Sequence, residues 1–445
     1  MRLRIRTGAM LAAGIVIALP SLASEDVFSD IIVVTARREI PQTEIIYADE
    51  AIPVSADGAS LISRLPGAAL IRNGSLSGQV QFRGAYGFRV GTRINGQAFH
   101  PGGPNLMDPP MHYAPPTLVE AIEVNRGAAP VAFGPSLVGG VNTELKQVPF
   151  TDTGIRESHY DVTLIGRSAD RSHGLGLVAG VASDTYRAFG IYSNERGHDL
   201  DWSGGEIDNT FHDREVFGAG FGFRTSESEW ELELRRHETG PTGNPPFAMD
   251  IDWVETNFAR LGYATTLGQT RLDVSIGFSD VDHGMSNSEH RPPPASIMRY
   301  RANRALAETL TLAVDLSSEF ERGDLSYGLD LDLAQMSSTI DNPQNPTFFV
   351  EPLPDIDQDR IGAHISWRQD LGAGEMEIGT RIDRHDSKAG LAETGAAVPM
   401  MPSMLAMQFN QGSRDWQDTT YDLLARYWMD TDLGAWRLSL ARKNR

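Results

Sequence analysis

The sequence predicts a mainly β protein, in which a compact N-terminal α/β unit precedes a long series of antiparallel, membrane-spanning strands. Two observations support this fold class. From about Tyr160 onward, segments of about ten residues alternate apolar and polar side chains, as transmembrane β-strands do. Between Gln81 and Gln147, short β-rich runs are each closed by a corner that contains glycine, the residue that tolerates positive φ. We therefore expect two domains of different kinds.

Composition limits the range of functions. The chain has 445 residues, of which 40% are hydrophobic, enough to bury at least two domains. The net charge of −20 argues against a nucleic-acid partner, because phosphate binding needs a basic face. The absence of cysteine excludes disulfides and thiolate metal sites. No segment after the N-terminus is apolar for long enough to be a membrane-spanning helix.

Residues 1–23 are expected to form a secretory signal. Arg2, Arg4 and Arg6 supply the positive start, and the apolar stretch that follows is too short to span a bilayer. Ser21–Ala23 supplies the small residues that signal peptidase needs. The alternative is an N-terminal anchor helix.

Residues 24–44 contain a short β-branched run beside a charged terminus. Such a segment suits recognition by strand addition, in which main-chain hydrogen bonds provide the affinity. The alternative is an ordinary first strand of the following domain. The residues of this run are Asp30, Ile31, Ile32, Val33, Val34, Thr35 and Ala36.

Residues 45–148 carry four separated motifs. They are Gln81–Gly84 (QFRG), Arg93–Gly96 (RING), Ile122–Gly127 (IEVNRG) and, last, FGP with GGVN at Phe133–Asn142. In this order they resemble the plug domain of TonB-dependent outer-membrane receptors. The resemblance implies a plug inside a barrel, and it implies that residues 30–36 are the TonB box, gripped by the TonB energy-coupling protein.

Residues 155–445 are predicted to form the transmembrane barrel, with segments such as Tyr160–Arg167 and Val216–Arg224 as strands. We expect about thirteen strands, whereas receptors of this kind have twenty-two. The chain stops in mid-pattern, so we expect a truncated barrel that does not close, since an open edge in lipid is costly. The alternative is a soluble β-sandwich or propeller.

A proline-rich loop of the plug gathers soft metal ligands. Thioether and imidazole groups are what a copper site would use without cysteine, and the prolines would reduce the entropy lost on binding. Asp108 and Tyr113 could orient an imidazole. The alternative is plain packing. The predicted ligands in this loop are His100, Met107, Met111 and His112.

Further methionines and histidines fall in segments predicted to be barrel loops, whereas packing methionines would favour strands. A second group, Met400–Met407, is also expected in a loop. The segments at Met107–Pro110 and Ala248–Ile251 resemble the copper subgroup of these receptors. The predicted barrel ligands are Met249, Met285, His290 and Met298.

The resemblance implies a receptor that imports its substrate through movement of the plug and catalyses nothing, with no bound cofactor. We expect a monomer in contact with lipid in the outer membrane of a Gram-negative bacterium. Copper or a small copper complex is the favoured cargo. A ferric siderophore is the alternative, although such pockets tend to present aromatic and Arg side chains. The sequence also leaves open an adhesion or signalling role and a non-functional fragment.

Overall fold

The computed structural model describes residues 43–49, 53, 55–103 and 105–444, which belong to one compact unit that begins at Ile40. The predicted signal segment and the predicted TonB-box residues 30–36 lie outside the described residues. Among the residues described, no helix is long and apolar enough to cross a membrane.

The plug is built from short strands and 3-10 helices in two small sheets. One has the strand order β1-β6-β7-β5, with β5 and β7 parallel, and the other has the order β2-β3-β4. The strands are β1 (Thr43–Tyr47), β2 (Ala68–Arg72), β3 (Gly78–Phe82), β4 (Ala85–Tyr86), β5 (Gly91–Ile94), β6 (Val119–Asn125) and β7 (Gly140–Leu145). The helices are η1 (Gly58–Arg64), η2 (Gly87–Arg89), η3 (Pro110–Tyr113), η4 (Pro116–Leu118) and η5 (Val131–Phe133).

The helical part of the predicted α/β unit thus consists of 3-10 turns in the described residues. Proline and glycine explain why these turns stay short. Pro66 and Gly67 follow η1 directly, and η3 and η4 lie between closely spaced prolines, which cannot continue a helical hydrogen-bond ladder.

The glycine corners adopt the backbone conformation that the sequence predicts. Glycines that end the motifs have positive φ, where other residues are strained. The values are 82° at Gly84, 76° at Gly96, 87° at Gly127 and 87° at Gly134. At Gly140 the requirement is close approach, because a Cβ there would lie 2.6 Å from the ring of Phe133.

Gly139 combines both requirements, so its replacement by alanine is expected to destabilise the plug by about 1–3 kcal/mol. Its φ is 65°, and an added Cβ would lie 2.7 Å from the carbonyl oxygen of Asn125. Protease resistance of the plug in increasing urea measures the loss. Gly154→Ala is the control, because Gly154 has a φ of 72° but open space around it. Equal losses in the two variants would contradict the importance of the close approach.

The barrel wall is one antiparallel sheet of thirteen strands, which confirms the predicted number. A separate hairpin, β11 (Leu200–Trp202) and β12 (Gly205–Ile207), lies in a loop with the helix η6 (Ile297–Arg299) in another. The wall strands are β8 (Glu157–Arg167), β9 (Ser172–Ala182), β10 (Tyr186–Gly197), β13 (His212–Arg224), β14 (Ser228–Thr239), β15 (Asp250–Leu267), β16 (Thr270–Ser286), β17 (Ala302–Phe320), β18 (Gly323–Asp341), β19 (Phe349–Leu371), β20 (Gly374–Ala389), β21 (Asp415–Thr431) and β22 (Gly434–Arg442).

The two faces of this sheet differ as the alternating pattern predicts. Along β13, Phe217, Phe221 and Phe223 point outward and are 39%, 50% and 40% exposed. On the other face of the same strand, His212 and Arg214 are buried against the plug side. An apolar outer face and a polar inner face are what a membrane-spanning sheet requires.

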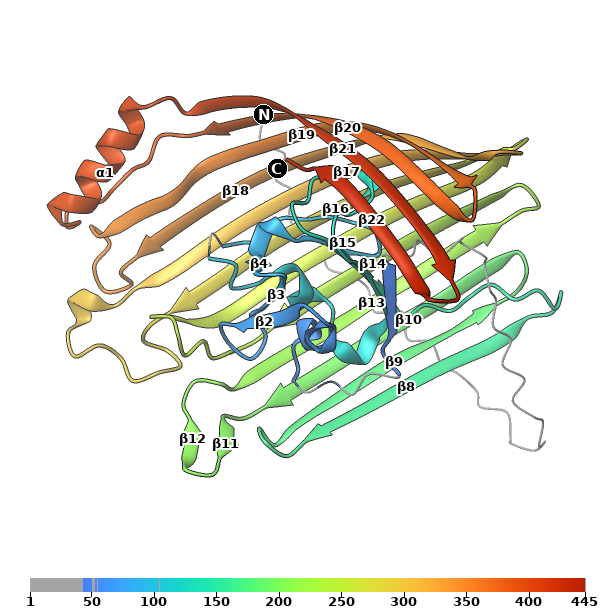
Figure 1. Ribbon diagram of the computed structural model, residues 1–445. Helices are drawn as coiled ribbons and strands as arrows, with labels where there is room; N and C mark the ends of the chain where they lie inside the picture. Colours follow the sequence, from blue (N-terminus) through green and yellow to red (C-terminus); the bar gives the residue numbers. More distant parts are fainter. Residues whose placement is uncertain (1–42, 50–52, 54, 104, 445) are drawn as a thin grey trace, which may run out of the picture. The chain divides into compact units, whose positions relative to one another are not determined.

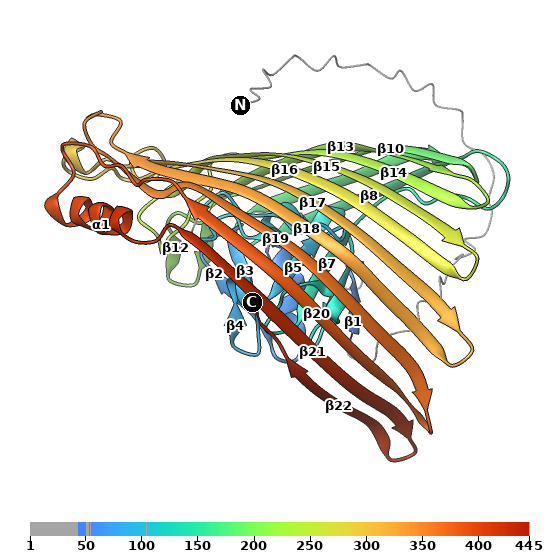
Figure 2. The same cartoon turned by 90° about the horizontal axis from the view of Figure 1, so that it is seen from above.

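The sheet is open. Its order runs from β22 to β8, and these two edge strands do not pair with each other. Figures 1 and 2 show the curved sheet with the plug, coloured blue to cyan, against its concave face. The fold class of a plug with a partly formed antiparallel barrel is therefore confirmed.

The two ends of the barrel differ. Short turns join strands at one end, at 225–227, 268–269, 321–322, 372–373 and 432–433. The other end, which we call the long-loop end, carries the segments 198–211, 240–249, 287–301, 342–348 and 390–414. In outer-membrane barrels the longer loops are extracellular. The last of these loops contains the helix α1 (Met400–Gln411), so Met400–Met407 lie in a barrel loop, as predicted, but in a helical part of it.

Arginines of the wall hold the plug through its main chain. Arg214 is 1% exposed and donates from Nη1 to the carbonyl of His112 at 2.8 Å, and from Nη2 to the carbonyl of Ala56 at 2.6 Å. Three other wall arginines make the same kind of contact with plug or linker carbonyls. They are Arg187 with Val148 (2.9 Å), Arg381 with Val131 (3.3 Å) and Arg426 with Ala128.

Candidate functional site

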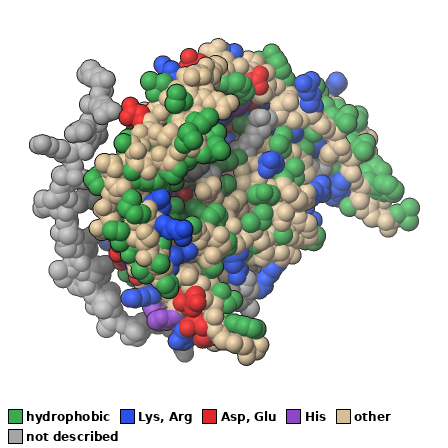
Figure 3. Space-filling model, turned by 90° about the vertical axis from the view of Figure 1, so that its left-hand side faces the viewer, with side chains coloured by type: hydrophobic (Ala, Val, Ile, Leu, Met, Phe, Trp, Pro, Cys, Tyr) green, Lys and Arg blue, Asp and Glu red, His purple; other side chains and the backbone are tan. Residues whose placement is uncertain are grey.

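A pocket of about 550 Å³ lies between the plug and the wall, towards the long-loop end. Its wall side is formed by β18 to β21 near their long-loop ends, and its plug side by β5 and the segment that follows it. Figure 3 shows the molecule from the long-loop end, where its face is hollowed. A pocket of this size suits a small molecule rather than a lone ion.

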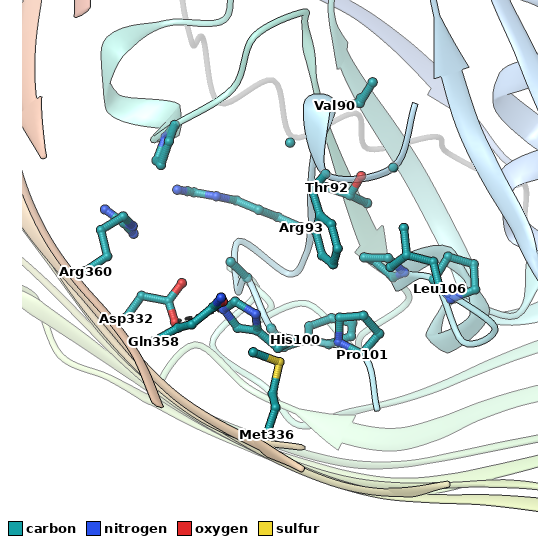
Figure 4. Close-up of a pocket in the computed structure, with 18 of the residues that line it drawn as sticks. Val90, Thr92, Arg93, His100, Pro101, Leu106, Asp332, Met336, Gln358 and Arg360 are labelled. Carbon is teal, nitrogen blue, oxygen red and sulfur yellow. Dashed lines mark ion pairs between the residues drawn. The ribbon is translucent and has the colours of Figure 1, made fainter. Parts of the chain in front are cut away.

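The predicted ligand His100 lies in this pocket. Its Nε2 is 3.6 Å from Oδ1 of Asp332, and its main-chain N–H donates to Thr309 at 3.2 Å. Met336 lies on the same face of β18 as Asp332, because side chains four residues apart along a strand share a face. Figure 4 shows Asp332, His100 and Met336 on one side of the pocket.

The predicted ligands Met107, Met111 and Met285 belong to one buried cluster, which also contains inner-face residues of β15, β16 and β17. Their exposed fractions are 3%, 1% and 5%. Met111 also lines the pocket, so the cluster begins at the pocket wall. Among the described residues, no three His, Asp or Glu gather to hold a metal, so a metal site here depends on the methionines.

His283 lies on the same strand as Met285 of this cluster. It lies two residues before Met285 on β16, so both side chains point from the same face, and it is 1% exposed. Its Nδ1 is 3.3 Å from Oδ1 of Asp108, whereas its Nε2 is buried without a hydrogen-bond partner in the described part of the chain. Buried polar atoms are usually paired, so this nitrogen is available to a ligand.

Asp108 is held in place as a partner of that imidazole. Its Oδ2 accepts from the main-chain N–H of Gly102 at 2.8 Å and from the hydroxyl of Tyr113 at 2.7 Å. Burial raises the pKa of Asp108, but the facing His283 and these hydrogen bonds outweigh burial and leave the pKa below its usual value. The carboxylate therefore orients His283, as carboxylates orient metal-binding histidines.

His112 lies beside this cluster but both of its ring nitrogens are engaged. Nδ1 donates to the carbonyl of Leu76 at 3.0 Å, and Nε2 accepts from the hydroxyl of Thr239 at 2.9 Å. Burial, with the charge of Arg214, lowers the pKa of His112 to about 4. In this arrangement His112 joins plug to wall as a neutral side chain.

The other predicted ligands are not brought together. Met249 packs against the buried cluster in a half-buried position. His290 faces Asp252, with Nε2 and Oδ1 3.3 Å apart, and Met298 is 55% exposed on η6. Their role as ligands stays a prediction. The prediction that Met285 lies in a loop was wrong, because Met285 lies within β16.

Sequence reasoning missed two wall residues, His283 as a ligand and Met336. The i, i+2 spacing of His283 and Met285 was a signal for a shared strand face, but the polar and proline-rich residues that follow hid the strand. The pocket is also lined by Arg93, Arg360 and Phe133. Arg and aromatic side chains therefore lie at the pocket together with Met and His.

Comparison with known proteins agrees with this architecture. The family model of the TonB-dependent Receptor Plug Domain matches residues 36–141. Residues 36–141 therefore match the plug domain of TonB-dependent receptors. Solved receptors share the fold over about nine tenths of this chain, at 11–18% identity. None of the curated proteins matches the chain.

Three solved structures illustrate the likeness. The copper transporter OprC has a TM-score of 0.77 at 18% identity, over 90% of this chain and 63% of that chain. FpvA of P. aeruginosa, bound to pyoverdines, has a TM-score of 0.62 at 12% identity, over 89% of this chain and 56% of that chain. The alcaligin receptor FauA from Bordetella pertussis has a TM-score of 0.62 at 13% identity, over 89% of this chain and 61% of that chain. This chain thus spans less than two thirds of the length of each.

Proposed function

We propose that this receptor takes up copper, or a small copper complex, across the outer membrane of a Gram-negative bacterium. The observation that carries the proposal is that Met107, Met111 and Met285 belong to one buried cluster, and that the Nε2 of His283, on the same strand as Met285, has no partner among the described residues. Thioether and imidazole ligands favour copper, and thioethers favour Cu(I) in particular. Hard cations such as Mg²⁺ and Ca²⁺ prefer oxygen ligands instead.

The pocket and the buried cluster give the substrate two successive positions. Copper enters the pocket from the long-loop end, where His100 and Met336 face it. Met111 belongs to both the pocket lining and the cluster, so the ion passes from the first set of ligands to the second without leaving soft donors. The site is otherwise closed, since the cluster methionines are nearly fully buried.

Release then requires movement of the plug, driven by TonB through residues 30–36. The next described strand is β1, an edge strand that among the described residues pairs with β6 alone. A pull on the chain before β1 acts on that one antiparallel pair. The receptor acts in this proposal as a monomer in contact with lipid, and it catalyses no reaction.

A ferric siderophore is the second candidate. The observation that favours it is the presence of Arg93, Arg360 and Phe133 around the pocket, since cations and aromatic rings suit an anionic chelate. The receptors FpvA and FauA share the fold. The buried thioethers favour copper over iron, because Fe³⁺ chelates present no open position to a thioether.

A titration of the purified receptor in detergent tests the proposal. Cu(I), Cu(II), Zn(II) and a ferric hydroxamate chelate are added separately, with a copper chelator as competitor. We expect Cu(I) to bind most tightly. Retention of the ferric chelate together with indifference to both copper ions would overturn the proposal in favour of the siderophore.

A further inference from the structure

Arg93 is a pocket cation that has no counter-ion in the described part of the chain. It lies on β5 of the plug and, among the described residues, makes neither an ion pair nor a hydrogen bond. The charges of the wall carboxylates Asp330 and Asp315 act on Arg93, but neither forms an ion pair with it in the described part of the chain. Asp330 is already paired with Arg360 and with Arg381.

The guanidinium of Arg93 is nevertheless fixed in place. Its Cζ lies 4.8 Å from the ring centre of Phe133, a cation–π geometry. Gly134 leaves room for it, because a Cβ there would lie 3.2 Å from Nη2 of Arg93. Figure 4 shows the side chain extending across the pocket towards the side of Arg360. A guanidinium held flat, facing a second cation and open to a cavity, is preorganised for an anion.

Another part of the pocket has different chemistry. His100 and Met336 are soft donors, and Oδ1 of Asp332 is buried without a hydrogen-bond partner among the described residues. A ligand that satisfies both sides carries a metal at one end and a carboxylate at the other. The volume of about 550 Å³ accommodates such a molecule, whereas a lone ion would leave most of the pocket to water.

We propose that this pocket takes the metal as a small anionic chelate, and that Arg93 binds the chelator's carboxylate. The inference rests on the proposed uptake of copper and names the form in which copper arrives. Burial, with the charges of Arg360 and Arg381, lowers the pKa of Arg93 from its usual value, although Asp330 opposes this. An anion at this position would relieve the repulsion between the guanidinium groups.

Two copper chelates of opposite charge test this inference on the purified receptor. Cu(II)–nitrilotriacetate is anionic, and Cu(II)–tris(2-aminoethyl)amine is cationic and of similar size. We expect the unmodified receptor to bind the anionic chelate at least about tenfold more tightly. Arg93→Met should weaken binding of the anionic chelate by about 10- to 100-fold and leave the cationic chelate within about twofold. Arg93→Lys should lose less affinity for the anionic chelate than Arg93→Met, since lysine keeps the positive charge but lacks the planar guanidinium.

The control is Arg89→Met. Arg89 is an exposed plug arginine on η2, close to Arg93 in sequence but outside the pocket lining. Its replacement should therefore leave the affinity for both chelates unchanged. Binding of Cu(I) alone by Arg93→Met shows that the variant is folded, because the buried methionines are intact.

The outcomes separate this inference from the proposed function. If Cu(I) binds but the chelates bind equally, or Arg93→Met leaves the anionic chelate unchanged, the anionic-chelate inference is wrong and copper uptake stands. If Fe(III)–nitrilotriacetate binds with the same dependence on Arg93 and Cu(I) is not retained, the role of Arg93 is supported and copper uptake is wrong.

Discussion

A receptor with both Met107→Leu and Met111→Leu is expected to lose at least about a thousandfold in affinity for Cu(I). Leucine keeps the volume and apolar character of the buried side chains, so the cluster stays packed while two thioether donors disappear. Competition titration with a Cu(I) chelator measures the loss. The matched control is Met376→Leu with Met429→Leu, two methionines near the short-turn end of β20 and β21. Unchanged affinity in the first variant would remove this cluster from the site.

Variants of the imidazole separate ligation from packing. His283→Ala is expected to lower Cu(I) affinity by about a hundredfold, because Nε2 of His283 has no hydrogen-bond partner among the described residues and is available to a metal. Asp108→Asn should lower the affinity by about 10- to 100-fold, since it removes the carboxylate that orients the ring. His198→Ala is the control, at an exposed position of the long-loop end. A full-affinity Asp108→Asn receptor would contradict the orienting role.

The second large effect concerns stability. Replacement of Arg214 by methionine is expected to lower the free energy of unfolding by about 3–5 kcal/mol. Arg214 is paired with Glu195, and both side chains are nearly fully buried, at 1% and 0%. The substitution leaves the carboxylate of Glu195 as an unpaired buried charge and frees the plug carbonyls of His112 and Ala56. Urea unfolding followed by protease sensitivity of the plug measures the change.

Two further variants give this prediction its contrast. Arg196→Met should cost less than about 1 kcal/mol, because Arg196 is 66% exposed and its pairing with Asp213 is screened by water. Glu195→Gln combined with Arg214→Met should recover part of the lost stability, since no charge is then left unpaired. If the double variant is as unstable as Arg214→Met alone, the cost comes from the lost plug carbonyl contacts and not from the buried charge.

Much of the fold could be predicted from the sequence because its signals are local. A glycine at a tight corner indicates the φ of its own residue. The positions of Gly84, Gly96 and Gly139 in the sequence were therefore sufficient to predict the positive φ found there. Alternation along a strand likewise reports which side chains face lipid, and the number of wall strands followed from it. The length of the strands did not, because inner-face polar residues such as His283 extend β16 into what reads as a loop.

The candidate site could be predicted only in part. Met107 and Met111 lie close together in sequence, so a cluster was visible. Their partner His283 comes from the wall, and the topology that brings it to Asp108 is set by pairing across the sheet. The lack of a counter-ion for Arg93 among the described residues could not be predicted from the sequence either. It depends on tertiary contacts, such as the pairing of Asp330 with Arg360.

The hydrogen bonds from wall arginines to main-chain carbonyls of the plug affect how the sequence of this protein can evolve. Arg187, Arg214, Arg381 and Arg426 bind oxygen atoms that every amino acid possesses. The identity of the plug residue at those positions therefore has little effect on how firmly the wall holds the plug. Plug side chains that line the pocket can therefore diverge while these main-chain hydrogen bonds keep the plug anchored.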